Sequence, residues 1–168
     1  MTEETKEMLA DKEEHDAFMD VALALAKGNL GSLKGGPFGA VVVKDGVVVG
    51  RGANSVTSLN DPTAHAEIVA IRDACKNLNS FQLDGCVIYS SCEPCPMCLG
   101  AIYWARPSKL FFAAGREDAA LAGFDDSYIY QQMPLHPADR DLPTAQMNAE
   151  KAIEIFKAWI QADNKTPY

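Results

Sequence analysis

The chain has 168 residues, of which 48% are hydrophobic, and its 15 Lys and Arg against 23 Asp and Glu give a net charge of −8. This composition suits one globular domain, and no apolar run approaches the roughly 20 residues of a membrane-spanning helix. Because nucleic-acid-binding proteins cluster Lys and Arg, the acidic balance argues against nucleic acid as a partner. Residues 1–14 are polar and acidic without an apolar segment, so we expect no secretory signal and a cytoplasmic protein.

The first half of the chain predicts a helix, a hairpin and a second helix. Residues 16–28 carry apolar side chains at helical spacing and end at a glycine. After a glycine-rich loop, two β-branched runs within residues 40–50 flank Asp45-Gly46, which is a strong hairpin signal. The segment Asp61–Thr63 combines capping residues with a proline and predicts the start of a helix that continues to about Lys76.

The second half alternates strands and helices. The pattern predicts strands over 86–90 and 109–113 with a helix between them that Pro94 begins, then a short helix and loop within 115–130, and finally an amphipathic helix over about 146–161. Strands that are joined through a helix lie parallel to each other. We therefore expect an α/β fold with a central mixed sheet between two layers of helices, a three-layer α/β/α arrangement.

Two short segments have the spacing of a metal site. His65 and Glu67 belong to the first, and Cys95 and Cys98 lie three positions apart in the second. On the first turn of a helix, Cys95 and Cys98 project from one face. Two thiolates and one imidazole leave a zinc ion with a fourth position for water, as in catalytic sites. His65, Cys95 and Cys98 are thus candidate zinc ligands, and Glu67 is a candidate proton shuttle.

Cys92 offers an alternative, because with the other three ligands it would complete a closed structural site. The protein would then be a zinc-stabilised binding module, and Glu67 would be a solvated surface charge. Cys92 precedes Pro94, which places it in a turn outside the expected helix, and a closed site has no use for Glu67. The open, catalytic site is therefore favoured. The odd number of five cysteines also argues against a disulfide framework.

The pairing of His-x-Glu with Pro-Cys-x-x-Cys resembles the signature of zinc-dependent nucleobase deaminases. That resemblance implies a hydrolytic reaction. Zinc would lower the pKa of its water ligand toward about 7, and the resulting hydroxide would attack a ring carbon that bears an amino group. Glu67 would carry protons from the water to the ring nitrogen and to the leaving ammonia.

The resemblance extends from about Asp16 to Tyr168. The segments GGPFGAVVVKDG, DPTAHAEIVAIR, SCEPCPMCLGAIYWARP and AGFDDSYIY are similar to the small bacterial guanine deaminases of the cytidine deaminase superfamily. This similarity implies a five-stranded mixed sheet, a single domain over 1–168 with one zinc ion per subunit, and a homodimer. It also implies conversion of guanine, a purine base, to xanthine by attack at C2.

The same resemblance implies residues that bind the base. Phe38 would stack on the purine, Asn54 would hydrogen-bond its far edge, and Asp126 would accept from the amino-pyrimidine edge. The remaining expected contacts are the backbone N–H of Ala66, the ring of Trp104 beside the base, and Tyr168. Tyr168 ends a helix and tail over 146–168. In the homodimer that the resemblance implies, the two subunits exchange these C-terminal segments, so that each covers the partner's site. Without the resemblance, such aromatic and loop residues are ordinarily structural.

Two related activities remain open from the sequence. Guanosine deaminases carry a similar FDD segment and a terminal tyrosine, but the large ring of Trp104 would occlude a ribose. Deaminases of adenosine in tRNA share the zinc motifs, but the acidic charge of this chain opposes binding to tRNA.

Overall fold

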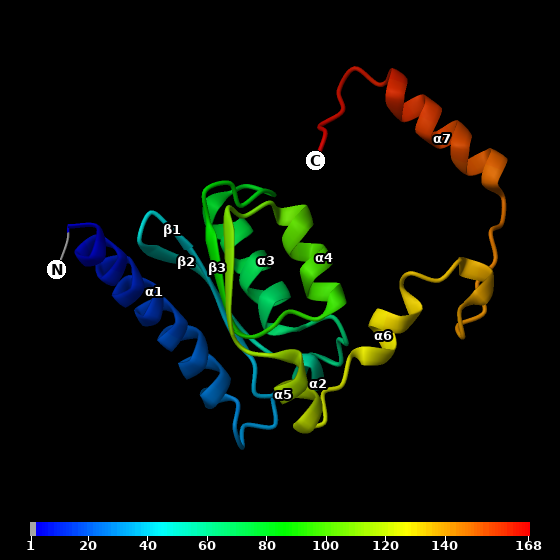
Figure 1. Cartoon of the computed structure of the whole chain (residues 1–168). Helices are drawn as coiled ribbons and strands as arrows, with labels where there is room; N and C mark the ends of the chain where they lie inside the picture. Colours follow the sequence, from blue (N-terminus) through cyan, green and yellow to red (C-terminus); the bar gives the residue numbers. More distant parts are fainter. Residues whose placement is uncertain (1–2) are drawn as a thin grey trace. The chain divides into compact units, whose positions relative to one another are not determined.

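The computed structural model describes the backbone of residues 3–168 and the side chains from residue 12 onward. Contacts divide the chain into two units, Met1–Asp126 and Ser127–Tyr168 (Figure 1). The expectation of one domain over 1–168 stays a prediction. Within the described residues, no helix has the length and apolar character needed to cross a membrane.

The first unit is built on one mixed sheet. Its strands are β1 Gly39–Lys44, β2 Val47–Ala53, β3 Val87–Cys92 and β4 Lys109–Ala114, in the order β2-β1-β3-β4. β1 pairs antiparallel with β2 and β3, whereas β3 and β4 are parallel, which confirms the prediction for strands joined through a helix. The five-stranded sheet implied by the resemblance is wrong for the described residues, which form four strands. After β4, the chain continues in helices.

The β1–β2 hairpin confirms its sequence signal. Asp45 and Gly46 have φ angles of 49° and 73°. Positive φ at both central residues is what a tight turn between two twisted strands requires, and Asp-Gly adopts it readily. The strong local signal therefore fixes how β1 and β2 pair.

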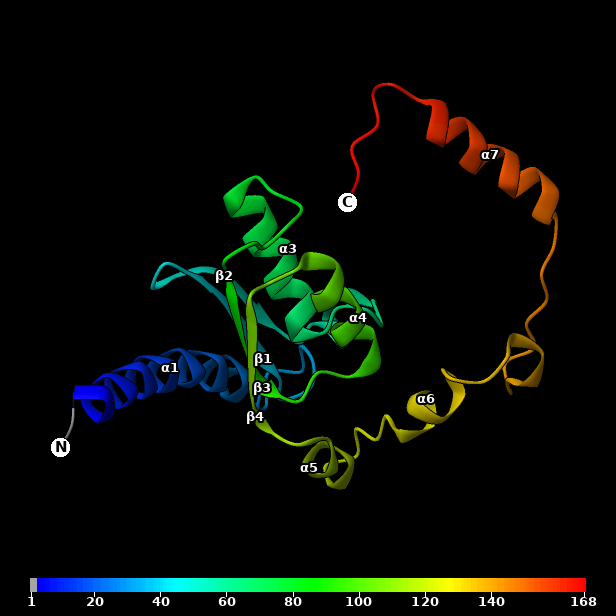
Figure 2. The same cartoon turned by 45° about the horizontal axis from the view of Figure 1, so that its top comes forward.

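Helices cover both faces of the sheet, which confirms the three-layer arrangement (Figures 1 and 2). On one face, α1 Glu3–Gly28 packs against Val41, Val43 and Tyr89. On the other, α3 Ala66–Leu78 and α4 Pro96–Ala105 enclose the core around Val42 and Ile88. The predicted first helix over 16–28 ends correctly, but its predicted start is wrong. Residues 3–15 are rich in Glu and Lys, which are good helix formers, and α1 includes them.

Small residues let α3 approach β2 closely. A Cβ atom at Gly52 would lie 2.0 Å from the carbonyl oxygen of Ala66, and one at Gly50 would lie 2.5 Å from that of Ala70. Side chains larger than hydrogen at these two positions would force the helix away from the strand. The N-terminal turn of α3 is thereby held against the sheet. A short helix, α2 Val56–Leu59, precedes it in the chain.

After α5 Arg116–Leu121 at the end of the first unit, the second unit contains α6 Ser127–Gln132, the 3₁₀ helix η1 Pro137–Asp139 and α7 Ala149–Gln161. The predicted final helix over about 146–161 is confirmed at its end, but it begins at Ala149, because Asn148 has a left-handed backbone conformation and caps the helix. α7 is amphipathic, and its large apolar side chains are exposed within this unit: Ile153, Ile155, Phe156, Trp159 and Ile160.

Candidate active site

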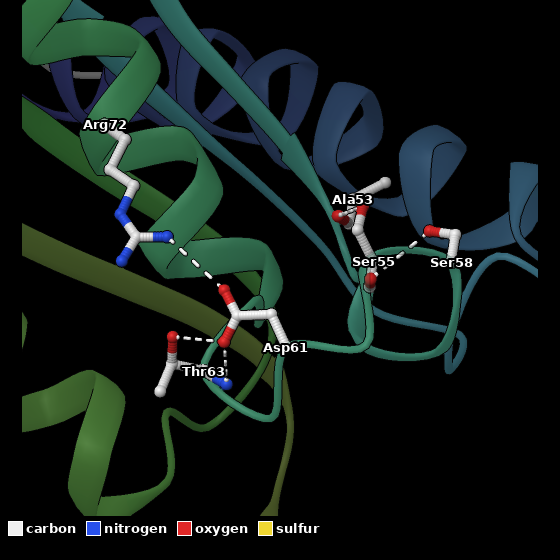
Figure 3. A network of polar contacts seen from close by, with 6 residues as sticks. All are labelled: Ala53, Ser55, Ser58, Asp61, Thr63 and Arg72. Carbon is white, nitrogen blue, oxygen red and sulfur yellow. Dashed lines mark hydrogen bonds and ion pairs between the residues drawn. The ribbon is translucent and has the colours of Figure 1, made fainter.

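A polar network shapes the loop that leads into α3 (Figure 3). One carboxylate oxygen of Asp61 accepts from the backbone N–H of Thr63 at 2.8 Å and from its hydroxyl at 2.7 Å, and the other lies 3.9 Å from Arg72. The expectation that Asp61–Thr63 begins the helix is wrong, because Asp61 closes a turn and α3 starts at Ala66. His65 is the N-cap residue, with extended backbone angles. The turn therefore delivers His65 to the helix N-terminus.

The two cysteines come from the start of α4. Cys95 is the N-cap residue and Pro96 occupies the beginning of the helix, where a missing N–H has no cost. The expectation that Pro94 begins this helix is therefore wrong by two positions. Cys98 lies in the first turn and is fully buried. Both halves of the expected metal site thus lie at helix N-termini, whose partial positive charge favours thiolates.

The structure brings the three expected ligands together. The Nδ1 atom of His65 lies 3.6 Å from the Sγ atom of Cys95. The ligand atoms of His65, Cys95 and Cys98 all lie within 4.8 Å of one another. In contrast, the thiol of Cys92 donates to the carbonyl oxygen of Gly115 at 3.7 Å. Cys92 is absent from the one group of metal-ligating side chains found among the described residues, which supports the open site.

The pKa values of the three expected ligands favour the binding of a cation. A hydrogen bond from the Cys98 thiol lowers the pKa of Cys95 to about 4. The same hydrogen bond raises the pKa of Cys98, and a hydrogen bond with Cys95 raises that of His65. A second thiolate beside the first needs a divalent cation to neutralise it. Two thiolates and one imidazole are a donor set that fits zinc, and zinc held there supplies an activated water.

Glu67 lies inside the protein next to these ligands. Its residue is only 6% exposed, and its Oε1 atom accepts from the hydroxyl of Ser90 at 3.4 Å. Burial raises the pKa of the Glu67 carboxyl above its ordinary value. A solvated surface charge is thereby excluded for Glu67. A buried carboxyl with a raised pKa is suited to accept and return a proton. Ser90 could not be predicted from the sequence, because its only signal there is a hydroxyl within a buried strand.

Two of the expected base-binding residues, Phe38 and Asn54, are joined by a hydrogen bond between their backbones. Asn54 is 6% exposed, and its Oδ1 atom accepts from the backbone N–H groups of Gly36 at 3.1 Å and Val56 at 3.2 Å. The ring of Phe38, half-buried, meets Phe124 edge to face, with 4.8 Å between centroids.

Asp126 is half-buried, and its carboxyl interacts electrostatically with Cys95, one of the expected metal ligands. Burial, and then the negative charge of Cys95, raise the pKa of its carboxyl. Phe124, which was not predicted as a site residue, precedes it by two residues and connects this loop to Phe38. Roles in base binding for Phe38, Asn54 and Asp126 stay predictions.

The other three expected contacts differ in exposure. Ala66 is fully buried as the first residue of α3, where the backbone N–H groups have no acceptor within the helix. Trp104 is 64% exposed on α4. Tyr168, at the end of the second unit, is 71% exposed. The roles of all three stay predictions.

Most of the first unit matches a known protein family. Residues 12–114 match the family described as the cytidine and deoxycytidylate deaminase zinc-binding region. The chain belongs to this family of zinc-dependent deaminases. The matched residues include all three expected metal ligands and Glu67.

The individual relatives of the chain include guanine deaminases and a tRNA-specific adenosine deaminase. Guanine deaminase from Bacillus subtilis is 52% identical over 154 residues, which are 92% of this chain and 99% of the relative. Its X-ray structure superposes with a TM-score of 0.89 over 92% of this chain and 98% of that one. A guanine deaminase structure from Nitrosomonas europaea is 36% identical, with a TM-score of 0.62 over 66% of this chain and 64% of that one. The tRNA-specific adenosine deaminase of Aquifex aeolicus is 47% identical over only 46% of this chain and 52% of its own.

Proposed function

We propose that this protein is a zinc-dependent guanine deaminase, which converts guanine and water to xanthine and ammonia. The observation that carries the chemistry is the buried carboxyl of Glu67 beside the cluster of His65, Cys95 and Cys98. The choice of guanine is supported by the relative from Bacillus subtilis, which is similar over almost the whole length of both chains. The net charge of −8 disfavours a tRNA substrate.

In this proposal, His65, Cys95 and Cys98 hold the zinc ion. Glu67 accepts a proton from the attacking water, gives it to the ring nitrogen next to C2, and supplies a proton to the departing ammonia. Its burial keeps the carboxyl away from bulk solvent, so that the proton passes between the water, the carboxyl and the base.

The proposed contacts to guanine follow from the donors and acceptors that the side chains can offer. Because Oδ1 of Asn54 already accepts two backbone hydrogen bonds, Asn54 offers its Nδ2–H donors to an acceptor on the far edge of the base. The carboxylate of Asp126 accepts from the ring N–H and the amino group of guanine with charge-assisted hydrogen bonds. Phe38 stacks on the ring, braced by Phe124. Ala66 and Trp104 complete the contacts of the first unit.

A substrate panel tests the proposal. Zinc-loaded protein is supplied separately with guanine, guanosine, adenine and cytosine, and ammonia release is measured at several concentrations of each. We expect the highest kcat/KM with guanine. Preference for guanosine or adenine would overturn the choice of substrate, and no release from any of the four would overturn the proposed activity. Glu67→Gln, assayed with guanine, controls for contaminating deaminases.

We further propose that the protein is a homodimer in which the second unit of one subunit covers the active site of its partner. α7 exposes five large apolar side chains within its own unit, and a water-soluble helix ordinarily buries such a stripe. Tyr168 lies beyond this helix and combines an aromatic ring with a hydroxyl, which suits a contact with a bound base. Light scattering on the full chain and on a chain that lacks 127–168 tests whether this unit is needed for the dimer.

A further inference from the structure

Asn29 connects three segments of the first unit. It follows the last residue of α1 and is only 7% exposed. Its Nδ2 atom donates to the carbonyl oxygen of Asn54 at 2.7 Å and to that of Gly36 at 2.9 Å. An amide nitrogen has two hydrogens, and the two bonds use both of them. The end of α1 is thereby tied to the segment that carries Asn54 and to the loop that leads to Phe38.

The same segments are also bonded to each other. The backbone N–H of Gly36 donates to Oδ1 of Asn54 at 3.1 Å, and the backbone N–H of Asn54 donates to the carbonyl oxygen of Phe38 at 3.0 Å. Asn29 therefore fixes the backbone of Asn54 while Gly36, held by the same Asn29 amide, fixes its side chain. The orientation of the Asn54 side-chain amide therefore depends on Asn29 and on Gly36.

The loop at Gly35 packs tightly against Asn54. A Cβ atom at Gly35 would lie 2.3 Å from both the backbone oxygen and the Oδ1 atom of Asn54. The loop thus passes against Asn54 at a distance that only glycine permits. A shift of the loop would consequently move the Asn54 amide, because close-packed atoms transmit displacement.

We propose that Asn29 is a positioning residue for base recognition, which acts through Asn54 by holding its Nδ2–H donors toward the base. The proposal rests on the proposed function, in which Asn54 contacts the purine. Asn29 itself does not touch the substrate. Its loss therefore weakens binding of the base only as far as Asn54 contributes to it, and it leaves the metal ligands and Glu67 in place.

A double-mutant cycle tests this inference. Asn29→Ala is made alone and together with Asn54→Ala, and kcat, KM, zinc content and melting temperature are measured for each protein. We expect Asn29→Ala alone to lower kcat/KM by at least about tenfold, chiefly through KM, with zinc retained. In the Asn54→Ala background, the same substitution should change kcat/KM by less than about threefold, because residues that act through one contact are not additive.

Controls separate positioning from stability. Ser32→Ala removes a hydrogen bond to the carbonyl oxygen of Asn29 in the same turn but none to Asn54, and it should leave KM unchanged. If Asn29→Ala does not fold, Asn29→Ser, which keeps one donor, replaces it in the cycle. Equal losses of kcat/KM in both backgrounds, or unchanged kinetics of the single variant, would overturn the inference. If the wild-type protein proves inactive on guanine, that failure belongs to the proposed function, and the cycle is run with the base of the panel that it deaminates best.

Discussion

Replacing Asp126 by alanine removes the carboxylate that we propose to read the amino-pyrimidine edge of guanine. The half-buried carboxyl lies close enough to Cys95 for the thiolate charge to raise its pKa. Two donors of guanine, the ring N–H and the amino group, would lose their acceptor. A hydrogen bond to a charged group contributes about 1.5–3 kcal/mol, and partial exposure of Asp126 reduces the sum of two such bonds to about 2–4 kcal/mol.

This free energy corresponds to a fall in kcat/KM of roughly 30- to 900-fold, since each 1.36 kcal/mol is about a factor of ten. Steady-state assays with guanine measure the fall, and metal analysis should find zinc unchanged because Asp126 is not in the ligand cluster. Asp125→Ala is the matched control at the exposed neighbouring position, and it should retain activity. A change below about threefold for Asp126→Ala, or equal losses for both variants, would refute the role of Asp126.

Three further predictions concern the metal, the proton shuttle and the tail. Metal analysis should find zinc retained in Cys92→Ala but lost in Cys98→Ala, and zinc loss in Cys92→Ala would contradict the three-ligand site. Glu67→Ala should keep its zinc while kcat with guanine falls by about 10²–10⁴-fold, and intact turnover would show that the carboxyl moves no proton. Deletion of Thr166–Tyr168 should preserve zinc and melting temperature but lower kcat/KM by at least about tenfold, because a closing segment excludes water from the site. Mixing that truncated chain with full-length Glu67→Ala should restore some activity if the tails are exchanged, whereas no rescue in a proven heterodimer would place each tail on its own subunit.

Local signals accounted for most of the fold. The Asp45-Gly46 turn and the last helix follow from patterns within short segments, and the parallel pairing of β3 and β4 follows from the helix that connects them. The start of α1 was placed too late because its acidic segment lacks an apolar stripe, although its residues are good helix formers. The fifth strand came only from the resemblance, and no segment of the sequence marked it independently.

The residues of the candidate site also differ in whether the sequence predicted them. The spacing of Cys95 and Cys98, together with His65, predicted the cluster from the sequence, because helix geometry puts residues three apart on one face. Asn29 and Ser90 were not identified, because their contacts reach partners 25 and 23 positions away in the chain. Their polar side chains are ordinary in sequence, and only the folded backbone brings them to Asn54 and Glu67.

Reaction of the zinc-loaded protein with guanine in ¹⁸O-labelled water tests the proposed activity most directly. Mass spectrometry of the product and an enzymatic ammonia assay are run on the same samples, with Glu67→Gln as the matched protein. Hydrolytic deamination predicts xanthine that carries one ¹⁸O atom and one ammonia for each guanine consumed, with both products greatly reduced in Glu67→Gln. Unchanged guanine, xanthine without the label, or equal turnover by Glu67→Gln would contradict a zinc-dependent guanine deaminase whose proton shuttle is Glu67.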